Sequence, residues 1–167
     1  RFTGDIWRNH PCCVVCMNEL QVTKNPEWSQ KVMNAIVKAQ IYSQENKQEV
    51  ARLLSKDGEK YLPMKAKVVE RAMTLYSQEA YGESNAIQNA SWGSGRIDFQ
   101  PWPFPSATKL IVDELKNTLV GGDNTFLNDL DPDFVVNDLV DYHFVKKAME
   151  KHSGWEKVPG FNAANPF

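Results

Sequence analysis

The stretch "NPEWSQKVMNAIVKAQIYSQEN", residues 25–46, carries the clearest structural pattern in the chain. Its apolar side chains recur at intervals of three and four residues, which is the spacing of one face of an α-helix. Asn25 is suited to the N-cap position and Pro26 to the first helical position. The stretch is therefore predicted to form a long helix that begins at Pro26 and buries one face. The residues of that face are Trp28, Val32, Ala35, Ile36, Ala39 and Tyr42.

Helical patterns continue on both sides of this stretch. Upstream, Asn18 is expected to begin a short helix that ends near Asn25. Downstream, the same spacing returns over residues 46–58, 64–76, 106–122, 131–141 and 141–154, with Gly58 as a left-handed stop and Ser106, Asp131 and Asp141 as caps. The residues predicted to face inward are Val50, Leu53, Leu54, Val68, Val69, Ala72, Met73, Tyr76, Leu110, Ile111, Leu115, Leu119, Phe144, Val145, Ala148 and Met149.

Two short strands are predicted beside the helices. The continuous apolar run "CCVVCM", residues 12–17, is typical of a buried strand of about six residues, and residues 97–99 form a weaker strand pattern. Between the helical segments, "QPWPFP", residues 100–105, alternates aromatic rings with prolines that cannot donate to a ladder. It is interpreted as a strap over a hydrophobic groove, with an aromatic lid as the alternative. The fold class predicted is α/β, mainly helical.

Composition and charge exclude two classes of partner. The chain has 167 residues, with 19 Lys and Arg against 21 Asp and Glu, and these charges are interspersed. The basic footprint of a nucleic-acid surface is missing, and no apolar run approaches the roughly 18 to 20 residues of a membrane span. The opening "RFTGDIW" lacks an initiator Met and a signal-peptide pattern. We therefore expect a fragment of a longer protein.

A family resemblance covers nearly the whole chain. Residues 3–11, "TGDIWRNHP", and the helical stretch over residues 25–55 resemble the C-terminal half of solute-binding proteins of ABC transporters in the nitrate, sulfonate and bicarbonate class. Residues 97–145 resemble one branch of that class. The resemblance implies the C-terminal part of a two-lobed periplasmic-binding-protein type II fold. Residues 1–17 would be a hinge return with a short strand, residues 18–153 a helical part packing on the first lobe, and residues 154–167 a surface tail.

The same resemblance implies a function in transport without catalysis and without a cofactor. Such a protein captures a small anion, in a periplasmic or membrane-associated extracytoplasmic place, and passes it to ABC permease subunits. Closure would occur about a hinge at residues 3–7. Most ligand-binding positions of the class lie upstream, in the missing N-terminal half. Thr3 and Trp102 are the weak candidates for ligand contact within this chain.

The cluster "HPCCVVC", residues 10–16, leaves two interpretations open. Cys13 and Cys16 have the spacing of a metal or disulfide pair, with Cys12 adjacent and His10 as a further metal ligand. Alternatively, the cysteines are small buried hydrophobes of the predicted strand. On a strand Cys12 and Cys16 would share one face and Cys13 the other, which favours the buried interpretation and no metal.

Two further functions stand as alternatives. Fungal thiamine-pyrimidine synthases share the solute-binding fold and carry a cysteine-rich cluster associated with iron, so a weak similarity to "CCVVC", residues 12–16, leaves an enzyme as one alternative. The other is a solute-binding-like sensor domain fused to a transporter ATPase.

Overall fold

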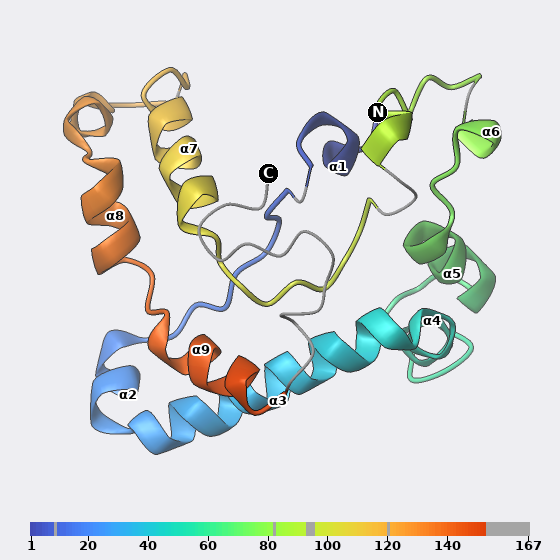
Figure 1. Cartoon of the computed structure of the whole chain (residues 1–167), viewed down its shortest axis with the longest axis horizontal. Coiled ribbons are helices and arrows are strands. Elements are labelled where there is room, and N and C mark those ends of the chain that lie inside the picture. Colours follow the sequence, from blue (N-terminus) through green and yellow to red (C-terminus); the bar gives the residue numbers. More distant parts are fainter. Residues whose placement is uncertain (9, 82, 93–95, 120, 153–167) are drawn as a thin grey trace. The chain divides into compact units, whose positions relative to one another are not determined.

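The computed structural model describes residues 1–8, 10–81, 83–92, 96–119 and 121–152, in which helices are joined by irregular segments (Figure 1). In chain order these are α1 Thr3–Ile6, α2 Glu19–Lys24, α3 Pro26–Glu45, α4 Lys47–Leu54, α5 Ala66–Thr74, α6 Gln78–Tyr81, η1 Ala90–Trp92, α7 Pro105–Leu115, η2 Thr125–Asp129, α8 Pro132–Asp138 and α9 His143–Glu150. The described residues contain no strand, so the mainly helical part of the prediction is confirmed. The predicted tail, residues 154–167, lies outside them.

The chain divides into two compact units. Unit 1 consists of Arg1–His10 with Lys38–Gln100, and unit 2 consists of Pro11–Val37 with Pro101–Phe167. Helix α3 contributes residues to both units. None of the helices formed by the described residues has both the length and the apolar character needed to cross a bilayer.

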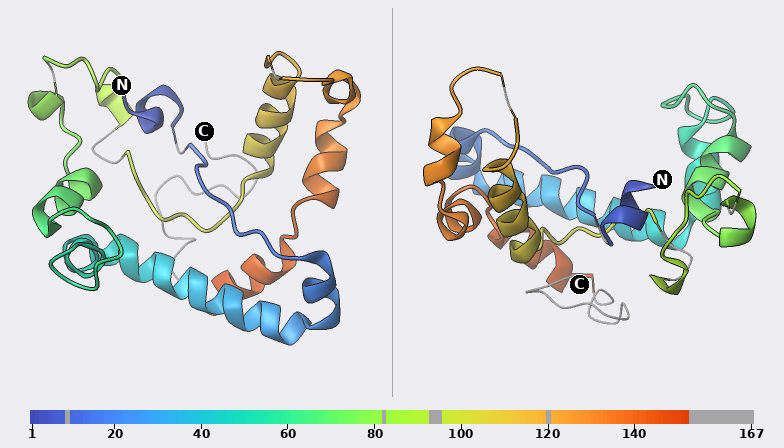
Figure 2. Two further views of the ribbon diagram at one scale, coloured as in Figure 1. Left: turned by 180° about the vertical axis from the view of Figure 1, so that it is seen from behind. Right: turned by 90° about the horizontal axis from the view of Figure 1, so that it is seen from above.

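In unit 1, helices α4 and α5 pack against each other, as Figures 1 and 2 show. Their shared core consists of Val50, Ala51, Val69 and Met73, with Leu54, Leu62 and Phe99 packed around it. The loop after α4 folds back on the helix, because Glu59 N donates to Leu53 O at 2.8 Å and Leu62 N donates to Leu54 O at 2.7 Å. A Cβ at Gly58 would overlap the carbonyl oxygen of Arg52. A side chain at position 58 has no room, so glycine is needed there. The prediction of a left-handed helix stop at Gly58 is wrong, because α4 already ends at Leu54 and Gly58 is not in the left-handed conformation.

Unit 2 confirms several predicted helix starts. The Asn18 side chain caps α2 by accepting from Leu20 N at 3.0 Å, and Asp131 caps α8 by accepting from Asp133 N at 2.9 Å. Lys109 of α7 forms an ion pair with Asp133, so the two packed helices are also joined by charge. Among the described residues of this unit, the buried ones are Ser29, Val37, Phe104, Ala107, Val112, Leu127, Val136, Val145 and Ala148.

The structure corrects the predicted strands and several buried faces. Residues 12–17 and 97–99 are irregular, because no described strand lies beside them to complete a ladder. On α3 the buried residues are Ser29 and Val37, whereas Trp28 is 51% exposed. The following residues predicted to face inward are exposed: Trp28, Ala35, Ala39, Tyr42, Leu53, Val68, Ala72, Leu110, Ile111 and Leu119. Val145 and Ala148 of α9 are buried as predicted.

Candidate functional site

A buried carboxylate in unit 1 is the most densely bonded polar group of the described chain. The side chain of Asp5 is 0% exposed although α1, which carries it, is a single turn. Its Oδ2 accepts from Gln88 N at 2.8 Å and from Arg1 Nε at 3.1 Å. Its Oδ1 accepts from Asn89 N at 3.1 Å and from Arg96 Nε at 3.1 Å. We call this arrangement the Asp5 clamp.

The backbone around Asp5 is held by the same partners. Asn89 Nδ2 donates to Asp5 O at 2.6 Å, and Arg96 donates to Asn89 O at 2.9 Å. A Cβ at Gly4 would overlap the backbone of Arg96, so the close approach of these two segments requires glycine. The ring of Phe2 packs edge-to-face on Tyr76 and Tyr81 with centroids 5.2 and 5.0 Å away. Residues 1–7 are thereby fixed to Ala86, Gln88, Asn89 and Arg96.

Electrostatics keeps this buried acid ionised. Burial by itself would raise the pKa of Asp5, but the N–H groups of Gln88 and Asn89 and the two arginines together lower it to about 2. The hydrogen bonds that the two carboxylate oxygens of Asp5 accept all come from donors within the protein. A carboxylate held in this way positions backbone segments and has little capacity left to act as a base. We therefore assign the Asp5 clamp a structural role.

The predicted ligand candidate Thr3 lies next to the clamp. Its side chain is exposed, and its carbonyl oxygen accepts from Trp7 N at 2.9 Å to close the single turn of α1. Sequence reasoning identified the "TGD" segment only through its resemblance and missed Asp5, whose partners other than Arg1 lie 83 to 91 positions away. The signal available in the sequence was one acidic residue among apolar neighbours, which is too common to be diagnostic.

The cysteine segment, residues 11–17 of unit 2, contradicts the buried interpretation. Cys12, Cys13 and Cys16 are all free thiols with exposed side chains. The Sγ atoms of Cys12 and Cys13 lie 3.7 Å apart in a weak hydrogen bond. No described His, Cys, Asp or Glu residues gather in threes in a way that would hold a metal ion, and this applies to His10 and the three cysteines. The prediction of a buried strand at residues 12–17 is wrong, because the described chain offers no strand beside these residues.

The second predicted ligand candidate, Trp102, lies in the "QPWPFP" segment of unit 2. Its ring is half-buried and contacts the ring of Tyr142, with centroids 5.4 Å apart. The next aromatic residue, Phe104, is buried ahead of α7. Burial raises the pKa of Tyr142, and its buried hydroxyl has no hydrogen-bond partner among the described residues. The buried hydroxyl of Ser106 also has no hydrogen-bond partner among the described residues.

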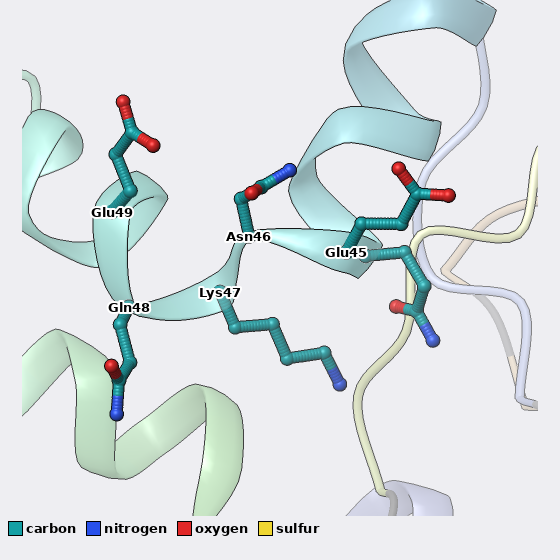
Figure 3. Close-up of a pocket in the computed structure, with 6 residues that line it drawn as sticks. Glu45, Asn46, Lys47, Gln48 and Glu49 are labelled. Atoms are coloured by element: carbon teal, nitrogen blue, oxygen red, sulfur yellow. The ribbon is translucent and has the colours of Figure 1, made fainter.

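Two hollows lie along the ends of α3. One, of about 430 Å³, is lined by the six consecutive residues from Gln44 to Glu49 at the α3–α4 turn (Figure 3). The other, of about 450 Å³, is lined by residues from Lys24 to Lys31 at the start of α3. Each is lined by one short stretch of chain and not by converging elements. These hollows therefore lack the enclosed, mostly apolar lining of an ordinary small-molecule site.

Comparison with known proteins gives one match. Residues 1–55 match the sequence profile of the NMT1-like family. The matched stretch contains Arg1 and Asp5 of the clamp, the cysteine segment and α1 to α4. It supports the nitrate-, sulfonate- and bicarbonate-binding class of solute-binding proteins of ABC transporters at the level of the family. No curated protein and no solved structure matches the chain significantly.

Proposed function

We propose that this chain is part of the solute-binding component of an ABC importer, and that it contributes to the capture of a small anion without catalysis. The observation that carries the proposal is the NMT1-like match over residues 1–55. The resemblance of residues 97–145 to one branch of the nitrate, sulfonate and bicarbonate class is an expectation from the sequence that agrees with this proposal. Solute-binding proteins of this kind typically work outside the cytoplasm, and we place this chain there with the permease as its partner.

The Asp5 clamp suits the rigid framework of a binding protein. It fixes residues 1–7 to Gln88, Asn89 and Arg96 within unit 1. The carboxylate of Asp5 is buried and saturated with donors, so it holds these segments in place. Because residues 3–7 lie within unit 1 and are held by the clamp, they do not supply the hinge expected from the resemblance.

The aromatic pair of unit 2 supports a contact with the anion. A buried hydroxyl without a hydrogen-bond partner is costly, by about 1–3 kcal/mol, until a ligand or water accepts from it. The Tyr142 hydroxyl is such a donor, and it belongs to the ring that contacts Trp102. Hydroxyl groups donate one hydrogen bond each and suit small oxyanions. We therefore propose Tyr142, beside Trp102, as a ligand-contacting residue of unit 2.

Calorimetric titration of the complete natural protein with nitrate, bicarbonate and a sulfonate tests the proposal. We expect saturable binding of one anion and recovery of that anion unchanged. Tyr142→Phe should weaken this binding about 10- to 100-fold, the loss of one hydrogen bond to a charged group. Tyr61→Phe is the matched control, because Tyr61 is 72% exposed, and it should leave binding unchanged. Absence of binding for all three anions would overturn the proposal.

One observation favours a second candidate, an enzyme related to thiamine-pyrimidine synthases that uses the cysteine cluster. The three thiols are exposed and therefore available for chemistry, which a buried strand would not have allowed. The same titration distinguishes the two functions when pyridoxal phosphate is included with and without iron. Binding of pyridoxal phosphate only in the presence of iron would favour the enzyme, and binding of an anion without iron favours transport.

A further inference from the structure

The connection between α1 and α2 concentrates all the thiols of the chain. Its three cysteines are exposed and free, and its backbone forms no ladder with the described part of the chain. Figure 1 shows this connection as an irregular stretch between the two helices. An exposed, unladdered backbone can change its local conformation without breaking a core. The thiols are therefore both accessible to a reagent and able to approach one another.

Covalent geometry separates the pairs that these thiols can form. Consecutive Cα atoms lie about 3.8 Å apart, whereas relaxed disulfides join Cα atoms about 4.4–6.8 Å apart. A bond between the adjacent Cys12 and Cys13 would therefore be strained, although their Sγ atoms are only 3.7 Å apart. Cys13 and Cys16 span at most about 10 Å when extended. A modest turn brings their Cα atoms into the relaxed range.

We propose that Cys13 and Cys16 are a site of reversible oxidation, at which exchange with a low-molecular-weight disulfide produces an intrachain disulfide and leaves Cys12 reduced. The thiolate of Cys16 attacks one sulfur of the reagent, forming a mixed disulfide and releasing one reagent thiolate. The thiolate of Cys13 then attacks Cys16 Sγ and releases the second reagent thiolate. Two protein thiols are oxidised and one reagent disulfide is reduced to two thiols, which take up the two protons.

The neighbourhood of Cys12 agrees with its role as the thiol that stays reduced. Its contact with Cys13 raises the pKa of Cys12, through the hydrogen bond first and then through repulsion between the two charges. A thiol with a raised pKa is a thiolate less often and attacks disulfides less readily at neutral pH. Oxidation would replace an irregular connection by a closed turn just where the chain enters unit 2.

The test equilibrates the full chain with glutathione disulfide and counts free thiols. We expect two of the three thiols to be lost together, with an intact mass lower by two hydrogens and without glutathione attached. All three cysteines lie in the tryptic peptide between Arg8 and Lys24, so fragmentation of that peptide identifies the bonded pair. A bond between Cys12 and either of the other two cysteines, a chain linked only to glutathione, a disulfide-linked dimer or three unreacted thiols would each overturn the proposal.

Single variants give an independent readout. Cys16→Ser should abolish the intrachain bond and leave only the mixed disulfide with glutathione. Cys12→Ser is the matched control and should form the bond to the same extent as the natural chain. Because both side chains are exposed, neither change is expected to alter folding. Equal behaviour of the two variants would contradict the assignment of Cys13 and Cys16 as the pair.

Discussion

The Asp5 clamp and the cysteine segment are close neighbours in sequence and opposites in structure. Asp5 is fully buried, and each of its carboxylate oxygens accepts from two donors. Cys12, Cys13 and Cys16 are exposed on a connection without a ladder. Both regions lie within the stretch that matches the NMT1-like family. Whether a segment is held in place therefore depends on the partners that distant residues supply and not on the local sequence.

Removal of the Asp5 carboxylate should have the largest effect on stability. Asp5→Ala leaves the buried guanidinium of Arg96 and two backbone N–H groups without their acceptor. The expected loss is about 3–5 kcal/mol in the free energy of unfolding, measured by urea titration. Asp5→Asn keeps the shape and one acceptor oxygen and should lose less. Equal stability of Asp5→Ala and the natural chain would mean that the clamp is no firmer than the cysteine segment.

Acid should weaken the clamp without changing the sequence. The pKa of Asp5 falls from an ordinary value of 3.8 to about 2 on folding. Because the folded pKa is the lower one, the stabilisation is complete above about pH 5 and is lost as the pH falls through about 2. Urea midpoints measured from pH 5 down to pH 2 should therefore decrease. Asp5→Asn should flatten part of this decrease, and an identical slope in both chains would exclude Asp5 as its source.

Gly4 should be the next most sensitive position of the clamp. Gly4→Ala forces the backbone of Arg96 away, and overpacking of this kind costs about 1–3 kcal/mol. Gly121→Ala is the matched control, because no atom lies within 4 Å of a Cβ placed there. Thermal denaturation of the two variants measures the difference. A larger loss for the control would show that the approach of residues 4 and 96 is dispensable.

The cysteine segment should tolerate change best. Val14 is 75% exposed, so Val14→Ser should alter the free energy of unfolding by less than about 0.5 kcal/mol. Val50→Ala, in the core shared by α4 and α5, is the comparison and should cost roughly 2 kcal/mol. A large loss for Val14→Ser in urea titration would reveal a partner that covers the segment.

These contrasts also explain how far the sequence predicted the fold. Several local signals were read correctly, as at the caps Asn18 and Asp131 and at the start of α3 at Pro26. The cap predicted at Ser106 is wrong, because α7 already begins at Pro105. Buried faces were read correctly only in part, as at Met73 and at Val145 with Ala148, because periodicity identifies a helix but not its neighbour. On α3 the buried set contains Ser29 and the neighbouring Trp28 is exposed. One residue is a rotation of about 100°, which is enough to exchange faces.

For the candidate sites too, local features were easier to predict than tertiary partners. Thr3 and Trp102 were named as candidate ligand contacts from short segments of sequence, and the structure places one on the surface and the other against Tyr142. The strand predicted for residues 12–17 required a partner that a single segment cannot specify. The Asp5 clamp was missed because its donors come from residues 88, 89 and 96. Such an arrangement has no short motif.

The long separation within the clamp also sets an order for its assembly. Asp5 leaves the ribosome 83 residues before Gln88, which at about 5–20 residues per second is a delay of roughly 4 to 17 seconds. During that time its carboxylate is hydrated and α1, a single turn, has no tertiary support. Residues 1–7 are therefore synthesised well before the residues that hold them in the folded chain.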